Sequence, residues 1–550
     1  MTTFDFATWT PSEPDPAALR AAFASFLERL PTEPVAVLAE EDALVREVVS
    51  WTGHARIRYR QDTTSADAGA ARKRAEALSV LLAELQLPLR ELLLAEPSLI
   101  HGVTEQEQMR WASEVASFSP EVAKDVLAEQ SLAAEYMALS GGAKVQFEGQ
   151  ELTLSQLQKP EVDDDRNRRE AASRVRWGWF ADRQGELDRI FDELVALRGT
   201  ISQKLGHRDF VETGYHRRAR IDYDRADVSA FRARVQSHVV PLVTALRERQ
   251  RAELGVDRLM LWDEAIFDAA GSPVPTDDLE GAGQTVMSAL GGELGDFFAL
   301  LHQNRLLDLR SRPGKGPGGF CSFLAGPRLP FIFANYAGTQ AGVKTLVHEL
   351  GHAYQDYSSR NHPRLADVWP TAEAAEVHSM SLEFLAWPHM EAFFGDQADR
   401  YRRQHLIRAL AFLPYGSAID DFQHAVYEDP ALGPAGRHAA WKTLQQRWMP
   451  SQDTGDLPHL AQGGYWQRQL HVYMYPFYYI DYVLAQVCAL QLWRLSQTDH
   501  ADALARWTAL CRSGGTKPFQ TMVRSVGLRS PFDDGVVEDV VDAAATWLDL

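Results

Sequence analysis

Long segments with helical periodicity and few turn signals fill most of the first 310 of the chain's 550 residues. Apolar residues recur there at intervals of three and four, which is the pattern of helices that bury one face. The predicted helical segments are Pro16–Leu30, Glu41–Thr52, Ala66–Glu96, Ser119–Leu139, Asp163–Leu205 and Asp227–Glu253. The pattern is helical again after Thr339, so we expect a mainly α fold that begins with an all-helical lobe.

The residue pattern stops being helical between Ser311 and Tyr336, where the glycine-rich RPGKGPGG precedes FCSFLAGPRLPFIFANY. Two short runs, Phe320–Leu324 and Pro330–Tyr336, combine β-branched and aromatic residues with Gly and Pro borders, which predicts a small hairpin or edge sheet. The glycine-rich segment lacks the spacing and the Lys-Ser/Thr ending of a phosphate-binding loop, so it does not indicate nucleotide binding.

The composition argues against several classes of function. Acidic residues outnumber basic ones by 75 to 56, a formal charge of −19, so most of the surface should repel nucleic acids and anionic membranes. The three cysteines are far apart and form no CxxC pair, which argues against a disulfide framework or a thiolate zinc site. The N-terminus lacks the basic and apolar regions of a signal peptide, and no apolar window reaches about 18 residues. We therefore expect a cytoplasmic protein without nucleic-acid or membrane partners, of undetermined oligomeric state.

Residues 345–357, TLVHELGHAYQDY, contain His348, Glu349 and His352 in an HExxH arrangement. On a helix the apolar residues of this segment form one stripe, and the two histidines fall on the opposite side. Their Cβ atoms would lie about 5–6 Å apart, so both imidazoles can bind one ion. Zinc takes two neutral imidazoles and a carboxylate and leaves a position for water. Glu349 can take a proton from that water, which is the hydrolytic use of this motif.

A third metal ligand is expected from a second helix over residues 371–387, TAEAAEVHSMSLEFLAW, which Thr371 can cap. This helix is apolar around most of its circumference. Its polar stripe consists of Glu373, Glu376, Ser379 and Glu383. Carboxylates on such a helix need a partner, because an unpaired buried charge is unfavourable. Spacing alone leaves Glu373 and Glu376 as alternatives, and His378, on the apolar side, is expected to be a core histidine.

Three segments in this order, HELGHAYQDYSSR, WPTAEAAEVHSMSLEFLAWP and WQRQLHVYMYPFYYIDYVLAQVCALQLW, resemble the M3 family of zinc oligopeptidases. The likeness is nearest to an oligoendopeptidase branch distinct from the PepF enzymes, which includes peptidases acting on collagen-derived peptides. It extends more loosely back to residues 196–215. In that family the ligand glutamate opens a Glu-x-x-Ser stretch and another glutamate follows seven residues later, which implies Glu376 as the ligand with Glu383 behind it. Many members have a histidine where this chain has Gln355, so the role of that histidine does not carry over.

The resemblance also implies a fold and a domain division. Family members have a mostly α-helical, two-lobed shell around a deep channel, here with a small β-sheet next to the HExxH helix. We expect residues 1–160 to form an N-terminal helical region and residues 161–550 to form the catalytic region. A deep channel would admit short peptides and exclude folded proteins.

The third of these segments supplies further catalytic residues that the resemblance implies. His471, Tyr479 and Tyr482 match the family's histidine and paired tyrosines, which stabilise the transition state. A tetrahedral intermediate carries negative charge on the former carbonyl oxygen, and pre-positioned donors there lower the barrier by about 3–4 kcal/mol each. The alternative is an aromatic core stripe, since the same region also contains Tyr473, Tyr475, Phe477 and Tyr478.

These observations predict a zinc metalloendopeptidase that hydrolyses internal bonds of short oligopeptides, with one zinc ion per chain at His348, His352 and Glu376. Glu349 would activate the zinc-bound water, while Tyr482 and His471 would stabilise the oxyanion.

The strand Pro330–Tyr336 is expected to be the edge on which an extended peptide substrate pairs its backbone. The glycine-rich segment Gly314–Gly319 is either a mobile loop over the cleft or an ordinary surface loop. Two alternative functions remain open: a zinc carboxypeptidase, which would release free amino acids, and a catalytically inactive helical homologue that binds peptides.

Overall fold

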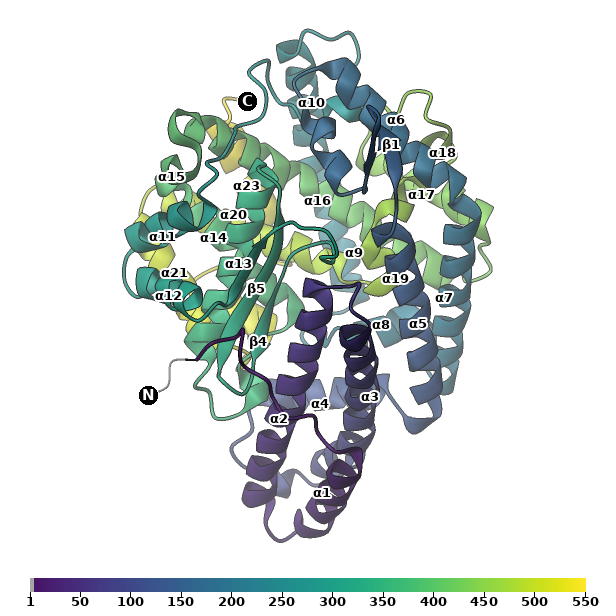
Figure 1. The fold of residues 1–550 in the computed structure, drawn as a ribbon, viewed down its shortest axis with the longest axis vertical. Helices are drawn as coiled ribbons and strands as arrows, with labels where there is room; N and C mark the ends of the chain where they lie inside the picture. Colours follow the sequence, from purple (N-terminus) through teal and green to yellow (C-terminus); the bar gives the residue numbers. More distant parts are fainter. Residues whose placement is uncertain (1–3) are drawn as a thin grey trace.

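The computed structural model describes residues 4–550, and the fold is mainly helical, as the sequence predicts (Figure 1). The helices before the main sheet are α1 (Pro16–Arg29), α2 (Pro34–Gln61), α3 (Ala66–Ala95), α4 (Glu105–Ser117), α5 (Ala123–Gly141), α6 (Arg166–Asp182), α7 (Gln184–Lys204), α8 (Phe210–Arg217), α9 (Arg225–Arg234), α10 (Val240–Glu253), α11 (Leu279–Leu290) and α12 (Leu294–Gln303). The helices after it are α13 (Gln340–Ser359), α14 (Ala372–Leu385), α15 (Glu391–Phe394), α16 (Ala398–Glu428), α17 (Pro434–Trp448), α18 (Pro458–Ala461), α19 (Leu470–Met474), α20 (Tyr479–Ser496), α21 (His500–Ser513), α22 (Phe519–Ser525) and α23 (Val536–Trp547).

The strands form two small sheets. Strands β1 (Val145–Phe147) and β2 (Gln150–Leu152) make an antiparallel hairpin. Strands β3 (Leu307–Arg310), β4 (Phe320–Leu324) and β5 (Leu329–Tyr336) make a sheet of order β3-β5-β4, in which β5 pairs parallel with β3 and antiparallel with β4. Helix α13 packs against β5, so this sheet lies directly beside the HExxH helix.

The N-terminal helices have a core of their own. Apolar side chains of α1 to α4, from Leu19 to Trp111, form a hydrophobic cluster separate from the main one. These helices lie at the lower end of the molecule in Figure 1, and α2 also packs against β4. The predicted division at residue 160 stays a prediction.

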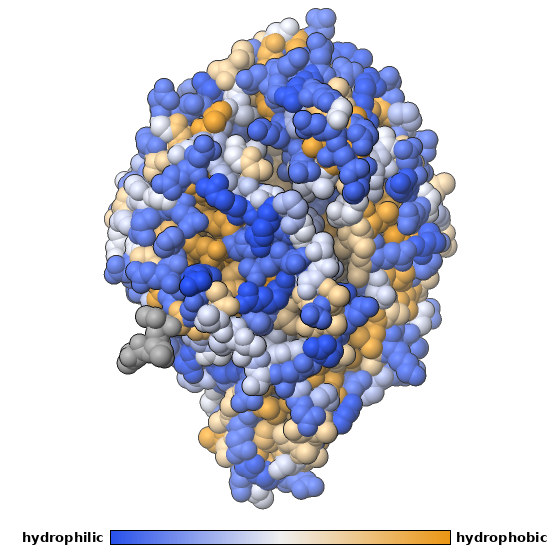
Figure 2. All heavy atoms as spheres, viewed as in Figure 1, coloured by the Kyte–Doolittle hydropathy of each residue, from blue (hydrophilic) through white to orange (hydrophobic). Residues whose placement is uncertain are grey.

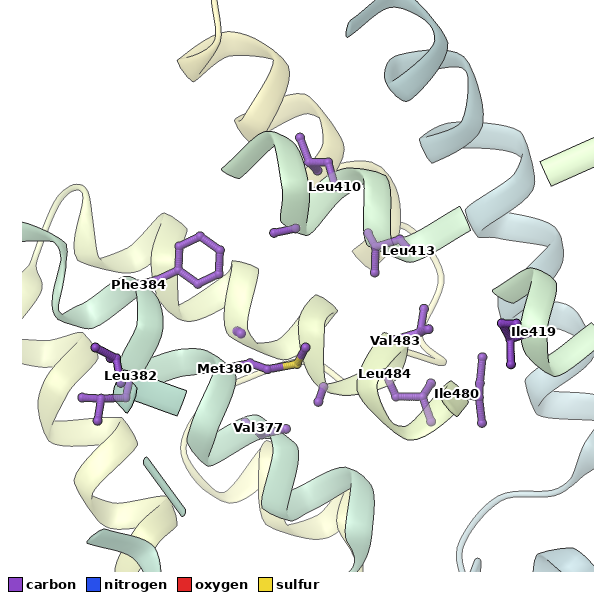
Figure 3. Packing of buried hydrophobic residues seen from close by; sticks show 14 of the residues in the cluster. Val377, Met380, Leu382, Phe384, Leu410, Leu413, Ile419, Ile480, Val483 and Leu484 are labelled. Carbon is purple, nitrogen blue, oxygen red and sulfur yellow. The ribbon is translucent and has the colours of Figure 1, made fainter. Parts of the chain in front are cut away.

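The main core is centred on α14, α16 and α20 (Figure 3). Helices α14 and α20 pack closely along their length, and α16 covers α20 from another side. Labelled side chains of this core are Val377, Met380 and Phe384 from α14, Leu410 and Leu413 from α16, and Ile480, Val483 and Leu484 from α20. Helix α14 is therefore held rigidly, which fixes the carboxylates on its polar stripe.

Several sequence predictions need correction. The segment Asp163–Leu205 is two helices that meet at Arg183, and helices α4, α8, α11 and α12 lie outside the predicted segments. The strand Pro330–Tyr336 is part of β5, which is the central strand because β3 joins it from the other side. The edge strand of this sheet on the side of α2 is therefore β4. Thr371 stands at the start of α14, but within the described chain its side chain makes no capping hydrogen bond.

Across residues 4–550, we find no helix with an 18-residue stretch apolar enough to cross a membrane. On the face shown in Figure 2, hydrophilic residues predominate, and a crevice opens near the centre.

Candidate metal centre and catalytic site

Helices α13 and α14 bring together the three residues that the sequence analysis assigned to a metal. The Nε2 atoms of His348 and His352 lie 3.2 Å and 3.4 Å from the same oxygen, Oε2 of Glu376. The two imidazole rings have centroids 4.9 Å apart. Glu376 is buried, whereas both histidines keep part of their surface exposed. One ion at this point can therefore contact all three side chains.

A glycine in the HExxH motif allows the two helices to approach this closely. A Cβ atom at Gly351 would lie 2.5 Å from the α-carbon of Ser379 and 2.7 Å from the carbonyl oxygen of His378. The backbones of α13 and α14 are thus in direct contact at this point. Glu376 lies one turn before that contact, which places its carboxylate beside the two histidines.

Hydrogen bonds behind His348 determine which of its nitrogens faces the cavity. Trp387 donates its indole N–H to Nδ1 of His405 at 3.0 Å, so the proton of His405 is on Nε2 and is donated to Glu383 at 2.7 Å. The other oxygen of Glu383 accepts from Nδ1 of His348 at 2.8 Å. Nδ1 of His348 is therefore held by Glu383, and Nε2 faces Glu376 as the nitrogen that a metal ion can bind in place of a proton.

The electrostatics of the cluster favour a positive charge. Burial acts to lower the pKa of His348, yet hydrogen bonds with Glu376 and Glu383 raise it to about 10. Two carboxylates that hold a proton so firmly would also stabilise a divalent cation. Two imidazole nitrogens and one carboxylate oxygen form the ligand set that zinc takes in hydrolytic sites, so these residues fit zinc.

Glu349 lies next to His348, but it is not one of the three side chains that converge on the candidate metal position. Its Oε2 atom is buried and has no hydrogen-bond partner among residues 4–550. Burial raises the pKa of the Glu349 carboxyl. A carboxylate that is poorly solvated and faces a cavity is a better base than one on the surface.

A cavity of about 650 Å³ opens in front of these residues. Its lining includes His348, Glu349 and His352 from α13 and Glu376 from α14. Helices α2 and α3 also line the cavity, with Arg56 and Ser79 among their lining residues. Strand β4 forms a third side, from Phe320 to Phe323. The N-terminal helices thus complete the cavity.

The edge strand β4 begins close to Glu349, the candidate general base. A Cβ atom on Gly319, the residue before β4, would lie 3.3 Å from Oε1 of Glu349. The glycine-rich segment before it is anchored, because Asn335 donates to the carbonyl oxygens of Gly316 and Gly318 at 2.8 Å. The side chain of Lys315 is fully buried and donates to Asp308 at 2.8 Å. These contacts favour a fixed loop at the cavity rim.

Tyr478, which the sequence analysis did not select, contacts Glu376 of the candidate metal centre directly. It donates to Oε1 of Glu376 at 2.6 Å, while Ser379 donates to Oε2 at 3.0 Å. Tyr478 and Tyr482 are one helical turn apart and both line the cavity. Tyr479 is not among the lining residues. Its ring packs against Phe412 and Tyr415 on one hand and against His471 and Tyr482 on the other. The i, i+4 spacing of Tyr478 and Tyr482 is the sequence signal that could have found Tyr478.

His471 lies beside these tyrosines, with its ring stacked on Tyr478 at 5.7 Å and at right angles to Tyr482 at 5.8 Å. Burial lowers the pKa of His471 to about 4, so the imidazole is neutral at pH 7. Tyr415 donates to the Oε1 atom of Gln469, and Gln469 donates to Nδ1 of His471 at 2.7 Å. The single proton of His471 is therefore on Nε2, where it can be donated.

The three remaining positions that the sequence analysis singled out are Gln355, His378 and Glu373. Gln355 lies one turn after His352 and donates to Ser359 and to the carbonyl oxygen of Val368, which ties α13 to the loop before α14. His378 is fully buried, away from the cavity. Glu373 is also buried, and it does not belong to the group of metal-ligating side chains.

Two histidines one turn apart and a carboxylate from a second helix define the class of HExxH metal sites, here on a mainly helical fold. The chain belongs to peptidase family M3, whose sequence pattern matches residues 296–541. A solved structure of Pz peptidase A with an inhibitor is 38% identical, with a TM-score of 0.97 and 99% of each chain covered. A Bacillus anthracis structure named oligoendopeptidase F is 35% identical, with a TM-score of 0.92, covering 100% of this chain and 99% of that one.

Curated relatives are more distant. The Bacillus subtilis oligopeptidase PepF is 22% identical over 302 residues, which are 53% of this chain and 44% of that protein. The chain spans less than half the length of the curated relatives it matches, 44% and 48%.

Proposed function

We propose that this protein is a zinc metallo-oligopeptidase that hydrolyses internal bonds of short peptides. The observation that carries the proposal is the convergence of His348, His352 and Glu376 on one point of a cavity that Glu349 also faces. Membership of peptidase family M3 supports the reaction class.

The three ligands would hold the zinc ion, with Glu383 keeping His348 in its ligating tautomer. Lewis-acid stabilisation of negative charge on oxygen is the chemistry that zinc would supply when bound. Glu349 would take the proton of the attacking water and pass it to the leaving amine. Its partner-free Oε2 atom and the raised pKa of its carboxyl support both roles.

Hydrogen-bond donors near the candidate metal ligands would stabilise the tetrahedral intermediate. Tyr482 lines the cavity and would donate to the developing oxyanion. His471 is not among the lining residues, but it packs against Tyr482 with its proton on Nε2, so it would donate to the same oxyanion once substrate is bound. Tyr478 would hold the carboxylate of Glu376 in place. The assignment of Tyr479 stays a prediction from the family resemblance.

The substrate would lie along β4 in place of the predicted β5. Edge strands bind extended peptides through backbone hydrogen bonds, and β4 is the strand that lines the cavity. Because the N-terminal helices α2 and α3 also line the cavity and enclose it, we expect it to favour short flexible peptides over folded proteins.

The test is a product map on a library of quenched peptides, with and without a chelator and after zinc is restored. We expect internal cleavage that the chelator abolishes and zinc restores. Release of single C-terminal residues would identify a carboxypeptidase, and absence of cleavage at full zinc content would identify an inactive peptide-binding homologue. Glu376→Gln should lose metal and activity, whereas Glu373→Gln should keep its metal.

A further inference from the structure

A second group of metal-ligating side chains lies at the turn between α7 and α8, outside the catalytic cavity. Ligand atoms of His207, Glu212 and His216 lie within 4.8 Å of one another. In residues 4–550 this is one of only two such groups, and the other is the catalytic set. The ring centroids of His207 and His216 are 5.3 Å apart, close to the 4.9 Å of the catalytic pair His348 and His352.

Buried hydroxyl groups assign the tautomer of His207. Ser202 donates its only hydroxyl proton to the carbonyl oxygen of Arg198 at 2.9 Å, so its oxygen accepts from Thr213 at 2.8 Å. Thr213 then has no proton left for His207, although its oxygen lies 2.8 Å from Nδ1 of that ring. The proton must be on Nδ1, which leaves the Nε2 lone pair free. A backing hydrogen bond of this kind is typical of histidines that ligate metals.

The carboxylate of Glu212 is also positioned by the local fold. Its Oε2 atom accepts the backbone N–H of Arg208 at 3.0 Å, which leaves Oε1 unengaged. Glu212 and His216 are four residues apart on α8, so their side chains share one face of the helix. His207 precedes α8 and reaches the same face from outside the helix. All three side chains are half-buried, which leaves room for water to complete the coordination.

Three basic residues near this group are paired with carboxylates, which reduces their repulsion of a bound cation. Arg225 pairs with Asp209 at 2.8 Å, and Arg208 pairs with the same carboxylate at 3.1 Å. Lys204, at the end of α7, pairs with Asp125 at 2.6 Å.

We propose that His207, Glu212 and His216 bind a second divalent transition-metal ion. Zinc is the ion with which we test this proposal. Two imidazoles and a carboxylate are ligands suited to zinc. Tetrahedral zinc at about 2.1 Å from each ligand separates the ligand atoms by about 3.4 Å, so the partly exposed side chains close slightly on binding. The ion joins the loop before α8 to the helix itself and thereby stabilises the turn between α7 and α8. This proposal is independent of the catalytic assignment.

The experiment counts zinc per full-length chain after metal removal, reloading with Zn²⁺ and gel filtration. We expect two ions in the parent, one in His216→Gln, one in His352→Gln and none in the double variant. The matched control is His302→Gln, because His302 pairs with Glu280 alone at 2.7 Å on the surface, and it should retain two ions. Anomalous diffraction at the zinc edge should show a peak among His207, Glu212 and His216.

Thermal unfolding distinguishes the loss of a metal site from misfolding of a variant. Added Zn²⁺ should raise the Tm of His352→Gln, which keeps only the second site, and leave the Tm of the double variant unchanged. A parent that binds one ion and a His216→Gln variant that loses none would overturn the second site. Loss of an ion in His216→Gln with none lost in His352→Gln would contradict the catalytic assignment alone.

Discussion

Gly351 of α13 packs against the backbone of Ser379 on α14, at a point where a Cβ atom would lie only 2.5 Å from the Ser379 α-carbon. This contact sets the distance between the helix that carries His348 and His352 and the helix that carries Glu376. The geometry of the candidate metal centre therefore depends on a residue with no side chain.

Gly351→Ala should push α13 and α14 apart. We expect a loss of about 1–3 kcal/mol in the free energy of unfolding, the usual effect of overpacking, together with weaker metal binding. Denaturant unfolding and metal titration measure the two effects. Gly178→Ala is the matched control, because a Cβ atom there meets nothing within 4 Å and alanine should stabilise α6 by about 0.5–1 kcal/mol. Equal stability of the two variants would contradict the steric account.

Glu383→Gln should weaken metal binding without removing a ligand. The carboxylate accepts protons from both His348 and His405, whereas a glutamine amide presents an N–H group to one of them. Loss of a supporting partner of this kind lowers metal affinity by about 10–100-fold. Competition with a chromogenic chelator measures the affinity, and a value equal to that of the parent would show that Glu383 does not orient His348.

Glu373→Gln tests a neighbouring carboxyl that is buried in the same helix. Burial, with the nearby charge of Asp481, raises the pKa of Glu373 to about 8 from 4.5. Between these values the folded state binds more protons than the unfolded state, so this group makes the parent less stable as the pH rises. The variant should therefore gain stability relative to the parent from pH 4.5 to 8, and denaturant unfolding at several pH values checks it. A constant difference across that range would mean that Glu373 does not titrate as proposed.

Tyr482→Phe should lower kcat by about 10²–10³-fold, because it removes one donor to the oxyanion. Tyr479→Phe should change kcat by only a few-fold, since the Tyr479 ring packs between Phe412 and Tyr415. Steady-state kinetics on one quenched peptide compares the two variants. A large loss in Tyr479→Phe and a small one in Tyr482→Phe would reverse our assignment.

Local patterns predicted the part of the site that lies within single helices. The apolar stripe and the four-residue spacing of His348 and His352 belong to one helix, so the sequence alone brings them together. The choice of Glu376 over Glu373 came from the family resemblance, because both residues lie on one polar stripe and spacing does not separate them. The packing of α14 against α13 decides which of them reaches the metal centre.

The remaining features of the fold and the site depend on contacts between segments that are far apart in the sequence, so the sequence pattern did not predict them. The central position of β5 depends on pairing with β3, a partner some twenty residues earlier that the sequence pattern did not reveal. Tyr478 was missed because Phe477 before it adopts a left-handed conformation, with φ of 63°. Gln423 accepts from the Phe477 backbone N–H at 2.8 Å, and Arg220 donates to its carbonyl oxygen. These distant contacts determine which tyrosine faces the cavity.

Glu349→Gln, measured by kcat and zinc content on the same preparation, tests the central claim most directly. Glutamine keeps the size of the side chain but cannot accept the proton of water. We expect kcat to fall by at least the about 10²–10⁴-fold typical of general-base removal, with zinc content and peptide affinity retained. A kcat within a few-fold of the parent, at full zinc content, would contradict the role of Glu349 as the base and with it the proposed mechanism.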